Sequence, residues 1–150
     1  MTERPENLGE PGQAGSYALD EQVGFLLRQV SQRHAVIFAG GIGCDLTPTQ
    51  WAALAKLHEV GACSQNHLGR LTAMDAATVK GVVDRLAKRD LARTRSDPQD
   101  GRRLLVEITP AGRDLVERTI PRALAVTEET LAPLKPAERR TLLGLLRQLR

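Results

Sequence analysis

Positive charge is concentrated between residues 80 and 103. This segment holds eight Lys or Arg residues and four Asp residues, an excess of four positive charges in 24 residues. The whole chain carries a net charge of only +3, so the rest of the chain is slightly negative. A local excess of cations is typical of a surface that faces phosphates, more so than overall basicity.

Two short helices joined by a tight turn are predicted to position part of this charge. Ser64 is a candidate N-cap for a helix over 65–71, and a turn at 72–74 leads to a second helix over about 75–89. The apolar residues of the second helix share one narrow side, and small and basic residues occupy the other. The apolar residues are Val79, Val82, Val83 and Leu86. This pattern is typical of a helix-turn-helix.

A β-hairpin is predicted to carry the rest of the charge. The segments 91–95 and 104–108 are strand-like, and the residues between them are rich in turn formers. Arg102 and Arg103 lie at the tip of this wing, from which they can enter a neighbouring minor groove.

We therefore expect double-stranded DNA as a partner. Small side chains on the helix over 75–89 allow close approach to the major groove, and the start of the helix over 65–71 can bind a phosphate. The alternative is that these charges only keep the surface soluble. It is disfavoured because the basic residues coincide with the helix-turn-helix and the hairpin. The predicted DNA-contacting residues are Ser64, Gln65, Asn66, Asp75, Ala77, Thr78, Lys80, Gly81, Arg85, Lys88, Arg95, Asp100, Arg102 and Arg103.

Helices are predicted on both sides of this lobe, which spans 46–108. A first helix over about 19–39 should end at Gly40-Gly41 with a left-handed glycine cap, and Thr47-Pro48 should start the next. Thr109-Pro110 repeats that start signal before a helix to about residue 131, and a last helix follows over 136–149. The leucine-rich flanks, 17–45 and 109–150, are larger than the lobe can cover, which predicts a homodimer.

The fold class is therefore mainly α with a small β-hairpin wing, a winged helix-turn-helix domain flanked by helical dimerisation segments. One domain is expected over 17–150, after a flexible tail over 1–16. Neither a signal peptide nor a membrane span is visible, and two cysteines are too few for a disulfide framework. We expect a cytoplasmic protein without cofactor or metal. No motif supports an enzyme, and the local basicity argues against a protein-interaction module that has lost DNA binding.

Five stretches of the chain together resemble the MarR family of winged-helix regulators. They are LTPTQW (46–51), MDAATV (74–79), DRL (84–86), DPQDGR (97–102) and LVEITPAG (105–112). The resemblance implies a homodimer on a pseudo-palindromic operator, with repression relieved by a small aromatic or anionic ligand. It also implies that Arg102 is the wing arginine of the minor groove, with Asp100 as the wing aspartate. The stretch 17–33 and the Trp51 region resemble a branch that controls the breakdown of nicotinate-like heteroaromatic acids.

A ligand cavity is expected where the first helix, the Trp51 helix and the DNA-binding lobe meet. An aromatic floor with cationic or imidazole groups suits a small aromatic acid effector. The candidate ligand-binding residues are Arg33, His34, Phe38, Trp51, His58, His67 and Met74. An alternative is a thiol-based redox sensor that uses Cys44 or Cys63. The sequence leaves open whether the protein represses or activates.

Overall fold

The computed structural model describes residues 16–150, which belong to two compact units divided between Arg33 and His34. The first unit holds a 3-10 helix η1 (Leu19–Glu21) and the beginning of α1 (Val23–Gly41). The predicted tail, 1–16, lies outside the described residues except for Ser16.

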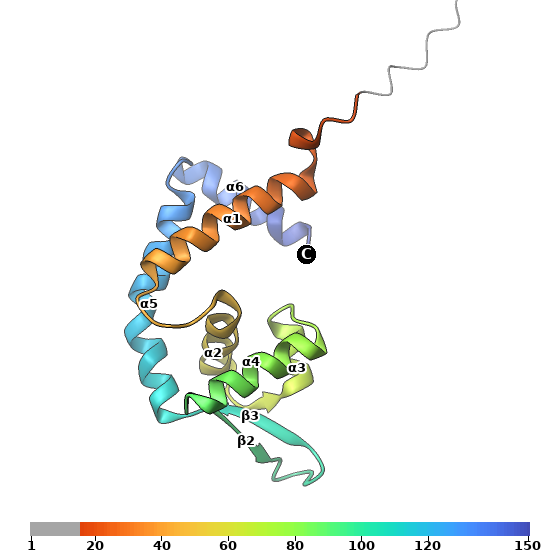
Figure 1. Cartoon of the computed structure of the whole chain (residues 1–150), viewed down its shortest axis with the longest axis vertical. Helices are drawn as coiled ribbons and strands as arrows, with labels where there is room; N and C mark the ends of the chain where they lie inside the picture. Colours follow the sequence, from red (N-terminus) through yellow and green to blue (C-terminus); the bar gives the residue numbers. More distant parts are fainter. Residues whose placement is uncertain (1–15) are drawn as a thin grey trace, which may run out of the picture. The chain divides into compact units, whose positions relative to one another are not determined.

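The second unit contains the rest of α1, five further helices and a small sheet (Figure 1). In chain order the elements are α2 (Pro48–Val60), β1 (Cys63–Ser64), α3 (Gln65–Leu71), α4 (Ala76–Lys88), β2 (Ala92–Ser96), β3 (Leu104–Ile108), α5 (Pro110–Leu131) and α6 (Pro136–Gln148). The sheet is antiparallel in the order β1-β3-β2, and β2 and β3 form the predicted hairpin. The fold is thus mainly helical with a β-hairpin wing, as predicted.

Side-chain caps explain why the helices begin where they do. The Thr47 hydroxyl accepts the N–H of Gln50 at 3.3 Å, and the Gln50 amide oxygen accepts the N–H of Thr47 at 3.1 Å, so α2 starts with a complete capping box. The starts of the next helices have the same kind of cap. Their capping residues are Ser64, Asp75 and Thr109. Each cap satisfies a backbone donor that the helix itself leaves open.

A single apolar core holds the helix-turn-helix to the sheet. The predicted inward face of α4 is buried throughout, at Val79, Val82, Val83 and Leu86. It packs in one cluster with residues of α2, α3, β3 and α5, among them Leu54, Leu68, Val106 and Val116. Because this cluster buries one side of α4 completely, the other side is held outward in a fixed orientation.

The Thr-Pro-x-Gly motif joins α5 to the base of the hairpin. The Thr109 hydroxyl donates to the Asp90 carbonyl at 2.6 Å, and the Thr109 N–H donates to the Leu91 carbonyl at 3.1 Å. A Cβ atom on Gly112 would overlap the Leu91 carbonyl oxygen, so only glycine fits there. The motif therefore has a packing role that fixes α5 against the wing.

Three details differ from the sequence predictions. The first helix begins at Val23 and not at about residue 19, because Gln22 is extended and separates η1 from α1. The left-handed cap expected at Gly40-Gly41 is wrong, because α1 includes both glycines and the positive φ, 71°, falls on Gly43. The third strand, β1, was not predicted, because two residues are too few to show a strand period.

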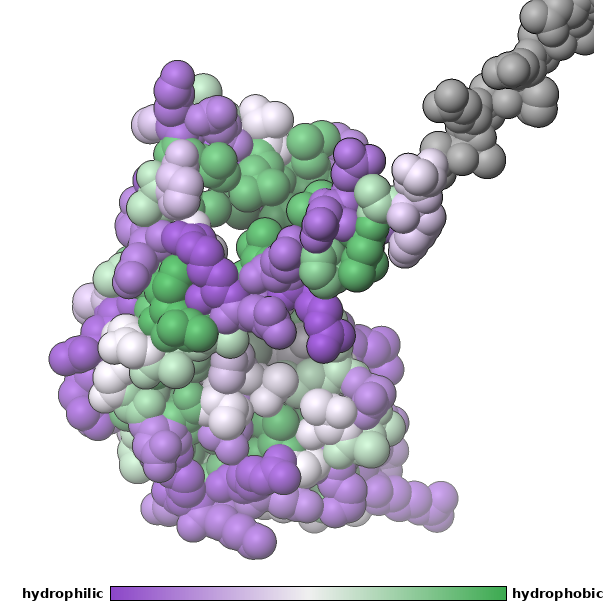
Figure 2. All heavy atoms as spheres, turned by 45° about the horizontal axis from the view of Figure 1, so that its top comes forward, coloured by the Kyte–Doolittle hydropathy of each residue, from purple (hydrophilic) through white to green (hydrophobic). Residues whose placement is uncertain are grey.

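The C-terminal helices expose apolar side chains. Leu124, Leu145 and Leu149 are 63%, 52% and 72% exposed. On the face drawn in Figure 2, hydrophobic residues gather toward these helices, whereas the hairpin end is largely hydrophilic. In residues 16–150, no helix combines the length and apolarity that a membrane span requires.

Candidate nucleic-acid interface and adjacent cavities

The start of α3 and the tip end of the wing line one surface hollow of about 360 Å³. Its lining, which we call the α3–wing hollow, comprises Ser64, Gln65, Asn66, Arg70, Arg103 and Leu104. The Ser64 hydroxyl accepts the N–H of His67 at 3.2 Å and so acts as the helix cap. The structure thus brings three predicted α3 residues together with a wing arginine, and adds Arg70, which the sequence analysis missed.

The outward side of α4 carries the predicted small and basic residues. Ala77, Thr78 and Lys80 are exposed, as are Arg85 and Lys88 one to two turns later. Gly81 is half-buried, and a Cβ there would lie 3.3 Å from the Arg85 guanidinium. Because the side chains at these α4 positions are small, the helix backbone can approach the edge of a DNA groove closely.

Asp75 has a local structural role at the start of α4. Its carboxylate accepts the N–H of Thr78 at 2.7 Å, and this backbone hydrogen bond lowers the pKa of Asp75. The ionised carboxylate also lies at the positive end of the helix dipole. Asp75 therefore positions the outward face of α4 by capping the helix.

The tip of the wing is organised by Asp100. Its side chain accepts the N–H of Arg102 at 3.1 Å, and its carbonyl accepts the N–H of Arg103 at 2.9 Å. A further bond from the Asp97 N–H to the Arg103 carbonyl, at 2.9 Å, closes the turn. Both arginine side chains are exposed. The aspartate thus shapes the turn that presents the two arginines.

Glu107 partly neutralises the outer face of the hairpin. Its two carboxylate oxygens accept the Nε–H groups of Arg93 and Arg95, each at 2.7 Å. These hydrogen bonds, that of Arg93 first, hold the pKa of Glu107 below its usual range. Arg95 was predicted to contact DNA, but its pairing with Glu107 across the strands was not predicted.

Lys80 is likewise paired, with Asp84 at 3.0 Å, as an exposed pair one helical turn apart. The other exposed cations of the 80–103 segment that the sequence assigned to DNA take part in no ion pair within the described part of the chain. They are Arg85, Lys88, Arg102 and Arg103. These four residues therefore supply most of the uncompensated charge of the surface.

A cavity of about 310 Å³ lies between the second half of α1, α2 and α5. This His34 cavity is lined by His34, Phe38, Trp51, Ile120, Ala123, Leu124, Val126 and Thr127. It joins three of the predicted ligand-binding residues, and the His34 and Phe38 rings lie 6.4 Å apart between centroids. His34 Nδ1 is 2.8 Å from the Thr130 hydroxyl oxygen.

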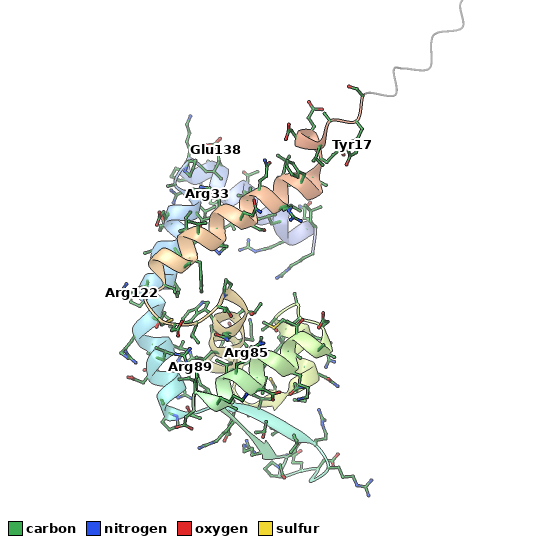
Figure 3. The ribbon with its side chains drawn as sticks, viewed as in Figure 1. Tyr17, Arg33, Arg85, Arg89, Arg122 and Glu138 are labelled. Atoms are coloured by element: carbon green, nitrogen blue, oxygen red, sulfur yellow. The ribbon has the colours of Figure 1, made fainter. Side chains whose placement is uncertain are left out.

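A second cavity, of about 580 Å³, shares Phe38 with the first. Its lining comes from α1, from the loop before α2 and the start of α2, and from Arg85, Lys88 and Arg89 at the end of α4. Figure 3 labels Arg85 and Arg89. Arg89 donates to the Asp45 carbonyl, which ties the end of α4 to the loop before α2. Arg85 and Lys88, predicted only as DNA-contacting residues, thus also line this cavity.

Three further candidate ligand residues, His58, His67 and Met74, do not line the His34 cavity. His58 faces Glu117 of α5 at 3.4 Å, and His67 accepts a hydrogen bond from Arg70 at 3.4 Å. Met74 packs against the core, and Arg33 belongs to the first unit. Among the described residues, no group of His, Cys, Asp and Glu is arranged to hold a metal ion.

The two cysteines differ in burial. Cys63 is buried in the core cluster, and burial raises the pKa of its thiol, which disfavours the reactive thiolate. Cys44 is half-buried and packs against two core clusters.

Comparisons with known proteins identify the family. A model described as MarR family matches residues 45–103. The HTH-type transcriptional repressor NicR of Pseudomonas putida is 41% identical over 89% of this chain and 85% of its own length. The chain belongs to the MarR family. This confirms the resemblance noted in the sequence, and the similarity to NicR agrees with the predicted branch.

Solved structures of MarR-like regulators confirm the fold. A probable transcriptional regulator from Pseudomonas aeruginosa has a TM-score of 0.85 and 58% identity, over 89% of this chain and 100% of its own. BpsR of Bordetella bronchiseptica has a TM-score of 0.86 and 45% identity, over 90% of this chain and 97% of its own. The DNA binding of BpsR is regulated by 6-hydroxynicotinic acid. The winged helix-turn-helix of this chain is thus that of a MarR-family transcriptional regulator.

Proposed function

We propose that this protein is a homodimeric, sequence-specific repressor that a small aromatic or heteroaromatic acid releases from its operator. The observation that carries the proposal is the exposed surface formed by the start of α3, the outward side of α4 and the wing tip. This surface holds the cations that form no ion pair within the described part of the chain. The names of two relatives support the two halves of the proposal. NicR is a transcriptional repressor, and BpsR has DNA binding regulated by 6-hydroxynicotinic acid.

Each part of the surface suits a different part of the duplex. The bare side of α4 fits the major groove, where Thr78 and the α4 cations can meet base edges and phosphates. The α3–wing hollow offers Gln65, Asn66 and two arginines to a phosphate. Arg102 at the wing tip would enter the adjacent minor groove, where a narrow groove concentrates negative potential.

The homodimer follows from the exposed leucines of the C-terminal helices. A large apolar face of this kind is stable in water only when another surface covers it. A second copy of the chain brings the same face and forms a two-fold symmetric interface. Two α4 helices spaced by about 34 Å would then read successive turns of a pseudo-palindromic operator.

The effector is proposed to bind in the His34 cavity. Its volume of about 310 Å³ falls at the lower end of the range for small-molecule sites, which suits a single aromatic ring. Phe38 and Trp51 offer faces for stacking, and His34 offers a polar contact. A ligand here would touch α1, α2 and α5 at once, and α2 and α5 both pack on the core that holds α4.

A cavity-filling variant tests this assignment. Thr127→Trp places a large ring at the exposed edge of the His34 cavity, whereas Ala125→Trp adds the same ring elsewhere on α5. We expect both variants to bind an operator fragment, and only Thr127→Trp to lose release by 6-hydroxynicotinate, as measured by fluorescence anisotropy. An unchanged response in Thr127→Trp would show that the effector binds elsewhere.

A further inference from the structure

The hydrogen bonds around Thr130 determine which nitrogen of His34 carries a proton. The Thr130 hydroxyl lies 2.8 Å from the Val126 carbonyl oxygen and 2.8 Å from His34 Nδ1. A carbonyl oxygen can only accept, whereas Nδ1 can donate or accept, so both contacts are hydrogen bonds only if the single hydroxyl proton of Thr130 points to Val126. The hydroxyl oxygen must then accept from His34, which requires a proton on Nδ1.

We propose that Thr130 fixes His34 as its Nδ1-protonated tautomer, so that Nε2 meets the effector as a hydrogen-bond acceptor. With Nδ1 occupied, Nε2 is the one polar atom of the ring that remains for a ligand. Thr130 itself does not line the cavity. It is therefore a positioning residue that acts through His34.

Few other polar side chains in the His34 cavity are available to an effector. Apart from His34, no ionisable side chain lines the cavity, and most of its other lining residues are apolar. In the Nδ1-protonated tautomer, Nε2 accepts a hydrogen bond and cannot donate one.

The effector class then becomes more specific. If the His34 cavity is the effector site, as proposed above, its ligand carries a hydrogen-bond donor on the ring, such as a hydroxyl or a ring N–H. An acid without this donor would leave Nε2 desolvated and unpaired, a loss of about tenfold or more in affinity. The geometry thus selects hydroxylated or lactam-type heteroaromatic acids over their unsubstituted parents.

The tautomer can be measured without any ligand, by long-range proton–nitrogen correlation spectra of 15N-histidine-labelled protein. The His34 signals are assigned by their loss in His34→Gln. We expect the Nδ1–H pattern in wild type and in Thr130→Ser, which keeps the hydroxyl. Thr130→Val removes the hydroxyl at almost constant volume and should shift the population toward Nε2–H. An Nε2–H pattern in wild type, or identical spectra for the serine and valine variants, would overturn the proposal.

The use of the tautomer is tested by titration calorimetry with 6-hydroxynicotinate, 6-methoxynicotinate and nicotinate. Wild type and Thr130→Ser should prefer the hydroxy acid by about tenfold or more, and Thr130→Val should bring the three acids within about threefold. Equal binding of the three acids by wild type would refute the donor requirement. If none of the acids binds while the Nδ1–H pattern is present, the effector assignment fails and the tautomer assignment stands.

Discussion

Replacing Arg102 with alanine should weaken DNA binding chiefly by removing charge. The Arg102 backbone is fixed by Asp100 through its own N–H, at 3.1 Å, so truncating the side chain leaves the turn intact. The guanidinium is exposed and takes part in no ion pair among the described residues, so its whole charge is available to DNA. A homodimer presents two such wings.

The size of the effect follows from counterion release. Each cation that neutralises a phosphate contributes about 0.9 to the slope of log affinity against log salt, so two copies contribute about 1.8. The slope for Arg102→Ala should be shallower by that amount. The affinity gap to wild type should therefore narrow by about tenfold between about 50 and about 200 mM salt.

Fluorescence anisotropy titrations of a labelled operator fragment over a salt series measure this slope. Arg140→Ala is the matched control, because Arg140 is exposed on α6 and its loss removes the same charge. The control should keep the wild-type slope. If both variants lose the same affinity at every salt concentration, the assignment of the wing to DNA is refuted.

Further predictions concern the elements that hold the surface. Gly112→Ala should lower the free energy of unfolding by about 2 kcal/mol or more in urea titrations, because its Cβ overlaps the Leu91 carbonyl, whereas Gly144→Ala in the open interior of α6 should be neutral or stabilising; equal effects would contradict the packing role. Asp75→Asn keeps a cap that does not titrate. Because the pKa of Asp75 is lowered on folding, its contribution to stability is present above the unfolded pKa and is lost as the pH falls through the folded pKa. Only wild type should therefore lose this contribution on acidification, and parallel pH–stability curves of the two proteins would argue against the capping role. A Cys44→Ser, Cys63→Ser double variant should still be released from DNA by the effector. If peroxide releases wild type from DNA but not the double variant, the thiol-based redox sensor is supported instead.

Features set by neighbouring residues could be predicted from the sequence. Ser64, Thr47 and Thr109 each cap a helix through a backbone group three residues away, so a short motif contains both partners. The apolar period of α4 likewise predicted its buried side, because one helix face was enough to show the pattern.

Features that depend on distant residues could not be predicted in this way. Glu107 meets Arg93 and Arg95 only through the register of the hairpin, and His34 meets Thr130 across 96 residues of chain. Such contacts depend on tertiary packing and leave no local period or spacing. For the same reason, the sequence could not show which of the histidines share one cavity. In the structure, His58 faces Glu117 and does not line the His34 cavity.

Selection of bound fragments from the genomic DNA of the source organism, followed by titration of the enriched duplex across salt, tests the DNA-binding claim most directly. We expect a dimer on each enriched fragment, with log affinity that falls linearly with log salt and far weaker binding to a scrambled duplex. A monomer in solution, or affinity that is indifferent to salt or to sequence, would contradict it.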